Sequence, residues 1–257
     1  MADLKVLSYN VNGVRSAIKK GLLDWLKGMD ADVVCLQELK ADDGAFDTAA
    51  FQTIGYHSFT FPAEKKGYSG VAILSKVKPD KVVKGCGIKE YDDEGRIIRI
   101  DIGDLSIISI YIPSGTTGEL RQAVKMKYLD DIYTYIHKLE KERPKLLVCG
   151  DYNICHKPID IHNPIANKDT SGFKPEERAW MDKFFDSGFI DTFRVFHPEP
   201  DQYSWWSLRA NSRANNKGWR IDYISATKNL QKNLLDAAMY QEAKHSDHCP
   251  VYLKLKK

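Results

Sequence analysis

Residues 97–113 read IIRIDIGDLSIISIYIP, and this stretch decides the fold class. Two runs rich in isoleucine, Ile97 to Ile102 and Ser106 to Ile112, are typical of β-strands, because β-branched side chains suit a pleated, buried surface. The Gly103-Asp104 pair between them is a turn, so the two runs form an antiparallel hairpin. A hairpin of this kind indicates a mixed sheet and makes a purely parallel, doubly wound fold less favoured.

Further strands can be read on both sides of this hairpin. They are short runs rich in Val and Ile, bounded by turn residues: Lys5 to Val11, Asp32 to Glu38, Gly70 to Lys76, Lys145 to Asp151, Arg220 to Ser225 and Pro250 to Leu255. No repeat, low-complexity tract or Pro/Gly-rich linker interrupts the chain. We therefore expect a single α/β domain over residues 1–257.

Helices are predicted between these strands. Residues 120–142 carry an apolar stripe at three-and-four spacing, made of Val124, Tyr128, Leu129, Ile132, Ile136 and Leu139. A second helix is expected to start at Pro175 and to stop at Gly188. A shorter one, near Ser16 to Gly28, is expected to bury Leu22, Leu23, Trp25 and Leu26.

Composition limits the class of protein. The 257 residues are 43% hydrophobic and 28% charged, which is typical of a soluble globular protein and excludes disorder and collagen. No apolar run approaches the roughly 18 residues of a membrane helix, and Met1 to Asn10 lacks the features of a secretory signal. We expect a cytoplasmic (nucleoid-associated) or nuclear protein that is neither secreted nor bound to a membrane.

Cysteines, charge and motifs exclude other classes of site. The five cysteines are scattered, mostly lie in apolar runs and form no CxxC pair, so buried thiols are expected rather than disulfides or zinc ligands. With 38 basic and 35 acidic residues, the net charge of +3 is too even to identify an anionic partner. No GxGxxG or GxxxxGK[ST] element follows a strand, so no motif points to a nucleotide cofactor.

Several apolar strands end in polar residues, and this pattern points to a shared cleft. These strand-end residues are Asn10, Asn12, Gln37, Glu38, Tyr111, Asp151 and Asn153. A rigid scaffold holds such groups in place while leaving them open to solvent. Glu38, with oxygen ligands from Asn10 and Asp247 and no His or Cys set, suits a hard cation such as Mg²⁺ better than zinc.

The run His245 to Pro250 places His248 beside a carboxylate just before the last predicted strand. His248 can act as a general base or as an electrostatic clamp if a second acid fixes its tautomer, and Asp222 is the candidate for that acid. No GxSxG motif is present and no cysteine lies in an activating setting, so covalent catalysis has little support.

The segment from Trp205 to Arg220, WWSLRANSRANNKGWR, combines four cations with three tryptophans and has no acid. Its cations are Arg209, Arg213, Lys217 and Arg220. Cations interleaved with aromatic rings suit a phosphate backbone and a flat apolar sugar or base. A solvated basic loop with core tryptophans remains the alternative. Residues 65–68, KKGY, form a smaller patch of similar character.

Together these residues resemble the exonuclease III type of apurinic/apyrimidinic endonuclease, within the endonuclease/exonuclease/phosphatase superfamily that includes DNase I. The resemblance covers the whole chain in eight collinear blocks: SYNVNGVRS (8–16), CLQELK (35–40), KKGYSGVAILSK (65–76), EGRIIRI (94–100), CGDYNICH (149–156), SGFKPEERAW (171–180), WWSLRANSRANNKGWRIDY (205–223) and SDHCPV (246–251).

The resemblance implies a fold and a set of residue roles. The fold is a four-layer α/β sandwich, with two mixed β-sheets packed face to face and flanked by helices. The implied metal ligands for Mg²⁺, for which Mn²⁺ can substitute, are Glu38, Asn10 and Asp247, with Asn12 and Lys40 behind them. Asp151 and Asn153 would position or activate the attacking water, while Tyr111 and the pair of His248 and Asp222 would bind the scissile phosphate.

The resemblance also implies the substrate. The implied contacts to the DNA backbone are Arg15, Lys20, Gly67, Tyr68 and Arg96, and Trp205, Trp219 and Ile221 would enclose a flipped-out abasic deoxyribose. Trp219 and Ile221 lie two residues apart, so we expect their side chains on one face of a short strand and Arg220 on the other. The expected activity is hydrolysis 5′ to abasic sites in double-stranded DNA, with 3′-5′ exonuclease activity and removal of 3′ blocks, by a monomer.

The sequence departs from this family at one loop. After Tyr111-Ile112-Pro113 many members carry Asn, whereas this chain has Ser114, and Thr116-Thr117 follows with no arginine. These changes put in doubt the loop contacts and the balance of activities. The alternatives are a chiefly double-strand 3′-5′ exodeoxyribonuclease, a phosphatase or phosphodiesterase acting on a small substrate, and an inactive DNA-binding module.

Overall fold

The two strands of residues 97–113 form the predicted hairpin at the centre of the molecule. The computed structural model describes residues 3–256. In it, β6 (Ile97–Ile102) pairs antiparallel with β7 (Leu105–Tyr111), from Ile97 opposite Ile110 to Ile102 opposite Leu105. β7 in turn pairs parallel with β8 (Lys145–Asp151), which makes the sheet mixed as the sequence predicted.

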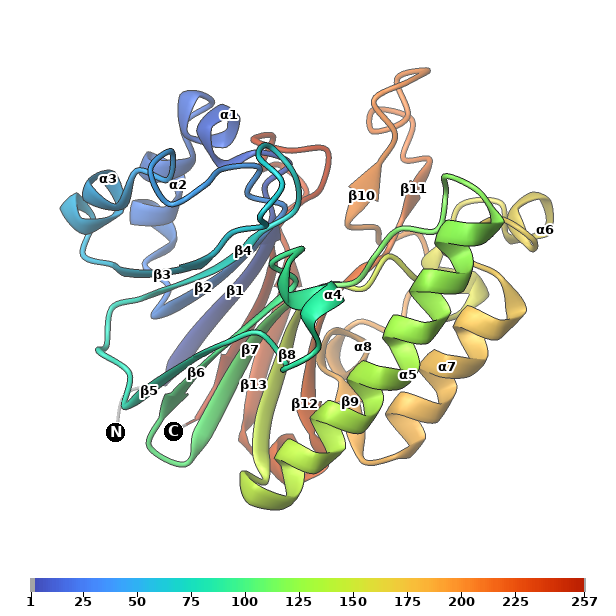
Figure 1. Cartoon of the computed structure of the whole chain (residues 1–257). Coiled ribbons are helices and arrows are strands. Elements are labelled where there is room, and N and C mark those ends of the chain that lie inside the picture. The colour runs from blue at the N-terminus through green and yellow to red at the C-terminus, as the bar shows by residue number, and fades with distance from the viewer. Residues whose placement is uncertain (1–2, 257) are drawn as a thin grey trace.

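Two six-stranded mixed sheets build the fold. In order across the first sheet, the strands are β13 (Leu234–Met239), β14 (Val251–Leu255), β1 (Leu4–Asn10), β2 (Val33–Gln37), β4 (Val71–Ser75) and β3 (His57–Phe61). The second sheet has the order β5 (Lys81–Lys84), β6, β7, β8, β12 (Asp222–Thr227) and β9 (Phe189–Asp191). A separate hairpin of β10 (Trp205–Trp206) and β11 (Gly218–Trp219) stands above them (Figure 1).

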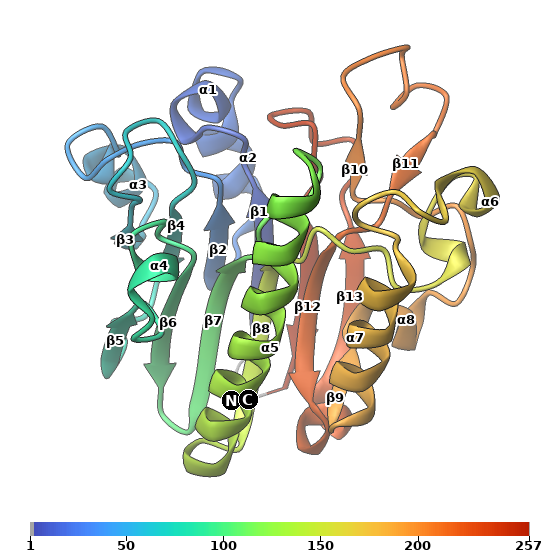
Figure 2. The same cartoon turned by 45° about the vertical axis from the view of Figure 1, so that its right-hand side comes forward.

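The sheets pack face to face with helices outside, so the predicted four-layer α/β sandwich is confirmed (Figures 1 and 2). Apolar side chains from both sheets fill the space between them, including Val6, Val71, Ile98, Leu147 and Ile224. Helices α1 (Val14–Lys19), α2 (Leu22–Met29) and α3 (Thr48–Thr53) cover the first sheet, and α5 (Glu119–Glu142) and α7 (Pro175–Asp186) cover the second. The shorter helices are α4 (Lys89–Asp92), α6 (Pro164–Asn167) and α8 (Thr192–Phe196), with 3-10 turns at Pro158–Asp160 and Lys228–Asn233.

Some helix predictions were wrong in detail. The helix expected at Ser16 to Gly28 is two helices, because the chain turns at Gly21, which has a φ of 92°. Only Leu22 and Leu26 of its expected apolar face are fully buried. In α5 the predicted stripe holds from Tyr128 onward, but Val124 is 42% exposed and the neighbouring Lys125 is buried instead.

The strand predictions missed the margins of both sheets. β3, β5, β9 and β13 were not predicted, and all four lie at sheet edges. Arg220 and Ile221 were expected inside a strand, yet they link β11 to β12.

Four of the five cysteines are buried, as expected, and Cys86 is half-buried. Within residues 3–256, no helix is long and apolar enough to cross a membrane.

A buried charge cluster fixes the link between β11 and β12. Asp160 accepts hydrogen bonds from Arg220 Nε at 2.8 Å and from Arg194 Nε at 3.1 Å, and Arg220 Nη2 donates to Asp191 at 2.6 Å. The backbone N–H of Arg220 also donates to the Asp160 carbonyl at 2.7 Å. Burial alone would raise the pKa of Asp160, but the two guanidinium groups more than offset it and lower this pKa to about 2.

We expect Asp160→Asn to destabilise the fold by about 3 to 5 kcal/mol at pH 7, because it leaves the buried Arg220 and the partly exposed Arg194 without their common carboxylate. The native pKa lies below the ordinary value of 3.8, so the charge stabilises the wild type above about pH 4, and this contribution is lost as the pH falls towards 2. Urea unfolding at pH 7 and pH 3 measures both effects. Asp182→Asn, whose side chain is half exposed beside Lys157, is the control and should change stability by less than about 1 kcal/mol. Equal effects of the two variants would contradict the assignment.

Candidate active site

Polar residues at the ends of five strands meet at one edge of the two sheets. Tyr111 lies beside Asp151 in the parallel pair β7–β8, and Asp222 lies opposite Asp151 in the antiparallel pair β8–β12. Asn10 ends β1 beside the end of β2. Tyr111 and Asp151 border a cavity of about 410 Å³ together with residues of several loops and of the β10–β11 hairpin, namely Asn12, Glu38, Lys40, Ser114, Asn153, Gly172, Trp205, Trp219, Asp247 and His248. Asn10 and Asp222 are buried and contact lining residues. Of the predicted strand-end residues, the structure brings Asn12, Glu38, Tyr111, Asp151 and Asn153 to this cavity, whereas Gln37 is buried and donates to the hydroxyls of Ser8 and Ser109.

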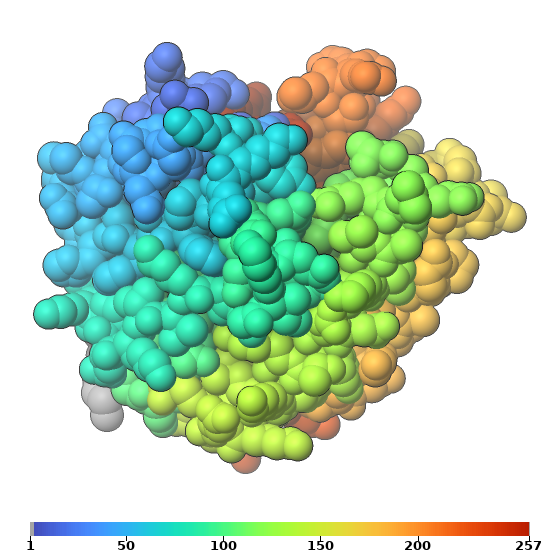
Figure 3. Space-filling model, in the orientation of Figure 1, coloured from blue at the N-terminus to red at the C-terminus, as the bar shows by residue number. Residues whose placement is uncertain are grey.

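The cavity opens on the upper edge of the molecule. In the space-filling view a hollow lies along this edge, with the region of α1 on one side and the segment that carries β10 and β11 on the other (Figure 3). Both walls come from loops and short elements above the sheets, while the floor is made of strand ends.

Asn10 links two carboxylates at the floor. It is fully buried, and its side-chain Nδ2 donates to Glu38 Oε2 at 3.0 Å and to Asp151 Oδ2 at 2.9 Å. Its Oδ1 accepts from the backbone N–H of Asn12 at 3.0 Å, and since that N–H can only donate, the amide orientation is fixed. Asn10 therefore presents a donor to the acids, which suits a bridge between them better than the direct metal ligand that the sequence predicted.

A second polar chain crosses from Glu38 to Asp247. Lys40 Nζ pairs with Glu38 Oε1 at 2.9 Å and donates to Asn12 Oδ1 at 2.5 Å, and Asn12 Nδ2 donates to Asp247 Oδ1 at 2.8 Å. Trp205 Nε1 donates to the other oxygen of Asp247 at 3.0 Å. Burial alone would raise the pKa of Asp247, but His248, Asn12 and Trp205 together lower it. Glu38 and Asp247 thus lie on either side of Asn12, which is joined to Asp247 directly and to Glu38 through Lys40.

The backbone at this edge is held in an uncommon conformation. Asn12, Glu38, Lys40 and Asn153 have positive φ values of 44°, 56°, 50° and 53°. Asparagine tolerates this region, whereas for Glu and Lys it is costly and persists only where surrounding contacts impose it. The strain therefore coincides with the residues whose side chains must turn into the cavity.

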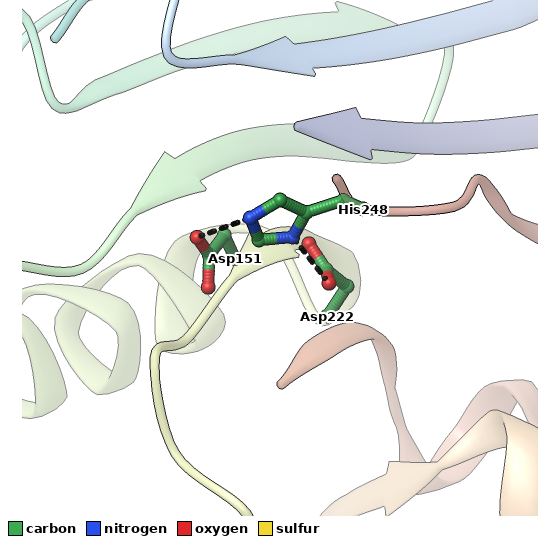
Figure 4. Close-up of side chains that lie close together, drawn as sticks. All are labelled: Asp151, Asp222 and His248. Carbon is green, nitrogen blue, oxygen red and sulfur yellow. Dashed lines mark hydrogen bonds and ion pairs between the residues drawn. The ribbon is translucent and has the colours of Figure 1, made fainter. Parts of the chain in front are cut away.

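His248 lies between two buried carboxylates (Figure 4). Its Nδ1 is 2.9 Å from Asp222 Oδ2, and its Nε2 is 4.0 Å from Asp151 Oδ2. Asp222 Oδ2 also accepts from the Ser204 hydroxyl at 2.7 Å. The Asp222–His248 pair that the sequence suggested is therefore present.

The charges in this group depend on one another. Burial would lower the pKa of His248, but Asp222, Asp151 and Asp247 more than offset it and raise this pKa to about 10. Burial and repulsion from Asp222 raise the pKa of Asp151 to about 7, while His248 and Asn10 oppose the rise. A histidine that is already protonated cannot accept a proton, so these pKa shifts favour the clamp over the general base for His248.

Two sets of residues can be considered for a metal ion. Within residues 3–256, ligand atoms of Asp151, Asp222 and His248 lie within 4.8 Å of one another. A protonated imidazole bonded to Asp222 has no free lone pair, however, so His248 does not fit as a ligand. Glu38 fits a cation better, since its carboxylate already pairs with the ammonium of Lys40 and is partly exposed to the cavity.

An apolar wall lies next to the charged group. Trp219 and Ile221 pack with Trp205 and with the buried Ile161 and Phe173. The rings of Trp205 and Trp219 meet edge to face with centroids 6.0 Å apart, and Trp205 forms a β-bridge to His248. Trp219 and Ile221 do share one side, as predicted, although they are not in one continuous strand.

Gly172 completes this wall. It has a φ of +97°, and a Cβ added to it would lie 2.8 Å from Trp219 Cζ3. Any side chain at this position would strain the backbone and displace the indole ring. The size of the pocket therefore depends on a glycine as well as on the tryptophans.

The basic segment beside the wall is less open than its composition suggested. Arg220 is buried in the Asp160 cluster. Arg213 donates to the carbonyls of Gln241, Ala243 and Ser246 and lies over the ring of Trp206, 4.6 Å from its centroid. Only Arg209 and Lys217 of the four cations are exposed to solvent.

The predicted backbone-contact residues fall into two groups. Arg15, Lys20 and Gly67 are exposed, and Tyr68 is half-buried. Arg96 is 1% exposed and donates to the Tyr68 hydroxyl at 3.0 Å and to the Tyr111 carbonyl at 2.9 Å. Arg96 is thus placed to hold these two tyrosines.

The sequence analysis missed Arg121. Its Nη2 donates to the Tyr68 hydroxyl at 2.8 Å and pairs with Glu94 at 3.3 Å. At the start of a long amphipathic helix it reads as one more surface charge, so nothing in the local sequence distinguishes it. Only the contact with Tyr68, 53 residues away, reveals it.

Comparisons with known proteins agree with this geometry. A family model described as the Endonuclease/Exonuclease/phosphatase family matches residues 7–248. The chain is 40% identical over 252 residues to an exodeoxyribonuclease of Bacillus subtilis (strain 168), covering 97% of this chain and 98% of that protein. It is 36% identical over 257 residues to the DNA repair nuclease APEX1 of Danio rerio, covering 99% and 83%.

Solved structures of nucleases also resemble this chain over its whole length. The structure of an AP endonuclease from Archaeoglobus fulgidus superposes with a TM-score of 0.91 at 32% identity and covers 99% of this chain and 100% of that one. A 3′-5′ exonuclease from Neisseria meningitidis superposes with a TM-score of 0.93 at 27% identity and the same coverage.

We expect Asp222→Asn to lower the pKa of His248 by at least about 2 units in the metal-free protein. The substitution removes the negative charge that most favours the imidazolium, while the burial that disfavours it remains. NMR titration of the His248 ring signals in chelator measures this shift. Asp104→Asn, at the exposed β6–β7 turn, should leave the titration unchanged. An unaltered His248 titration in Asp222→Asn would show that another group holds the charge.

Proposed function

The chain belongs to the Endonuclease/Exonuclease/phosphatase family, as an AP endonuclease and exodeoxyribonuclease III type of DNA-repair nuclease, and from this premise we propose that abasic sites in duplex DNA are its preferred substrate. It would hydrolyse the backbone immediately 5′ to the abasic site and leave a 3′ hydroxyl and a 5′ deoxyribose phosphate. The observation that carries this proposal is the apolar wall of Trp205, Trp219 and Ile221 directly beside His248.

The wall supports this substrate through the energetics of extrusion. A deoxyribose without a base has no pairing or stacking partner, so it can leave the helix at little cost. An intact nucleotide must give up pairing and stacking worth a few kcal/mol. The tryptophan rings and Gly172 bound the side of the cavity in which we propose that the sugar binds.

The roles of the side chains follow from the charges at the floor. Asp151, with its pKa raised to about 7, can take the proton of an attacking water, and Asn153 lies beside it with Nδ2 3.3 Å from Asp151 Oδ2. The imidazolium of His248 can bind the scissile phosphate and stabilise the charge that develops. Burial and the charges of Glu38 and Asp151 raise the pKa of Tyr111 well above its ordinary value, so its hydroxyl stays available as a donor.

We further propose that Glu38 and Asp247 hold Mg²⁺, which Mn²⁺ can replace, with Asn10, Asn12 and Lys40 orienting these carboxylates. Such an ion would neutralise charge on the phosphate oxygens. Because the residues named here all come from one chain, we propose that the protein acts as a monomer. Since the proposed substrate is genomic DNA, we propose that it acts in the cytoplasm at the nucleoid or in the nucleus.

The same centre can also act on 3′ ends. The lining of the cavity includes the short hydroxyl side chains of Ser114 and Thr116, bonded to each other at 3.0 Å. Such short side chains leave space for a terminal nucleotide or a 3′ block, and the reaction remains attack of water on phosphorus. We therefore propose 3′-5′ exonuclease and 3′-end-cleaning activity beside abasic incision.

We expect Trp219→Ala to reduce the ratio of abasic to intact DNA cleavage by about tenfold or more, because the sugar loses its wall while the charged group is unchanged. Single-turnover cleavage of matched duplexes, with and without one abasic analogue, measures the ratio. Trp219→Phe keeps an aromatic wall and should retain most of the preference. If the wild type cut both duplexes equally, the abasic proposal would be wrong and a general nuclease would remain.

We expect Glu38→Gln to lower the cleavage rate about 100-fold at limiting Mg²⁺ and to recover partly at high Mg²⁺, since the loss acts through metal affinity. Rates measured over a Mg²⁺ titration, with a chelator control, test this. Glu140→Gln, which removes a partly exposed carboxylate on α5 beside His137, is the matched control and should follow the wild type. Full activity in chelator would exclude a metal-dependent mechanism.

A further inference from the structure

A lysine and a glutamate form an ion pair that is completely buried beneath the catalytic edge. Lys125 of α5 and Glu177 of α7 are both 0% exposed, and Lys125 Nζ lies 2.5 Å from Glu177 Oε1. Taking two charges out of water costs several kcal/mol each, and well-packed apolar residues usually stabilise a fold at least as well. Stability alone is therefore a poor reason for this pair.

The lysine has a second contact, which is with a residue of the candidate active site. Lys125 Nζ donates to the backbone carbonyl of Asn153 at 2.8 Å. Asn153 is one of the positive-φ residues, and its side chain donates to the Ile112 carbonyl at 2.9 Å and to Asp151 Oδ2 at 3.3 Å. The ammonium thus supports an uncommon backbone conformation from below, at the residue that lies next to the proposed base.

The glutamate contacts the neighbouring loop, in which Gly172 lies close to the Asn153 carbonyl. Its Oε2 accepts from the backbone N–H of Gly172 at 2.6 Å and of Lys174 at 2.9 Å. Gly172 is the residue packed against the ring of Trp219. Glu177 therefore sets the position of the loop that limits the abasic pocket.

Gln122 extends this network to the loop that departs from the family pattern. Its Nε2 donates to Glu177 Oε1 at 3.1 Å, and its Oε1 accepts from the Ser171 hydroxyl at 2.8 Å. A Cβ on Gly115 would lie 1.9 Å from Gln122 Oε1, so the loop that follows Ser114 packs directly on this amide. Three cavity loops, at residues 114–116, 153 and 171–172, thus rest on one buried polar network.

We propose that Lys125 and Glu177 are positioning residues for the nuclease reaction. They hold Asn153 beside Asp151 and hold Gly172 against Trp219, so that the attacking water and the abasic sugar are placed relative to each other. Neither side chain touches substrate. This inference rests on the proposed function, because it names the residues that hold the parts of that site in position relative to one another.

The double variant Lys125→Met/Glu177→Gln separates positioning from stability. It leaves no unpaired buried charge, so its thermal unfolding should lie closer to the wild type than that of Lys125→Met alone. The support of the Asn153 carbonyl is lost all the same. We expect kcat on a duplex with one abasic analogue to fall about tenfold or more, KM to change less than about threefold, and the abasic-to-intact ratio to fall.

Asp101→Asn is the matched control for a buried ion pair. Asp101 is 3% exposed, pairs with Arg99 and Arg143, and lies opposite Ser106 at the far end of the β6–β7 hairpin from Tyr111. This variant should lose stability and keep the wild-type kcat and substrate ratio. A control that lost kcat equally would mean that any buried pair affects turnover, and the positioning role would be withdrawn.

The outcomes separate this inference from the proposed function. If the wild type fails to prefer abasic DNA, the proposed function fails whatever the variants do. If the wild type prefers abasic DNA and the folded double variant keeps both its kcat and its abasic-to-intact ratio, Lys125 and Glu177 have a structural role only. Should circular dichroism show the double variant to be unfolded, Glu177→Gln decides, because Lys125 can still donate to the amide oxygen while the N–H groups of Gly172 and Lys174 lose their acceptor. A kcat lowered about threefold or more at unchanged KM supports the role, and an unchanged kcat overturns it.

Discussion

The catalytic edge depends on one electrostatic constraint, the placement of two buried carboxylates opposite each other. Asp151 and Asp222 are paired residues of β8 and β12, and both are nearly inaccessible to water. Like charges directly opposite in an antiparallel pair destabilise a sheet, and burial increases the cost. The imidazolium of His248 between them offsets the repulsion. The same cation that makes the sheet tolerable is therefore the one that is available to an anionic substrate.

The rest of the site is arranged so that each acid has its own donors. Asn10 bridges Glu38 and Asp151, Asn12 and Trp205 hold Asp247, and Ser204 supports Asp222. The donors come from segments far apart in the chain, and several of the loops that carry the site have left-handed backbone conformations. Groups fixed in this way need little reorganisation when charge develops on a substrate, which is the main physical advantage of a preorganised site.

Sequence reasoning predicted the parts of this site that follow from strand ends and from the family resemblance. Asn10, Glu38 and Asp151 stand where apolar runs stop, the mixed sheet followed from the hairpin at residues 97–113, and the four-layer sandwich followed from the resemblance. It missed what depends on partners distant in the chain. Helical periodicity placed Val124 in the core. It could not show that Lys125 is buried instead, because the partner of Lys125 is Glu177, 52 residues further along the chain. Composition read Arg220 as a cation free to bind phosphate, although Asp160 and Asp191 neutralise it. The edge strands were missed because segments such as KVVK at 81–84 are half exposed and give a weak apolar signal.

The pairing of β1 with β14 has a consequence for the timing of activity during protein synthesis. Leu4 lies opposite Leu255, so one strand near the start of the described chain is completed only by a strand near its end. His248 lies just before that late strand, and a nascent chain that has not yet emerged past it has Asp151 and Asp222 without their cation. Contacts of such long sequence separation also form slowly, because the entropy of closing the intervening loop must be overcome first. A partly synthesised or truncated chain therefore lacks a working centre, and the nuclease cannot act on DNA until its own folding is complete.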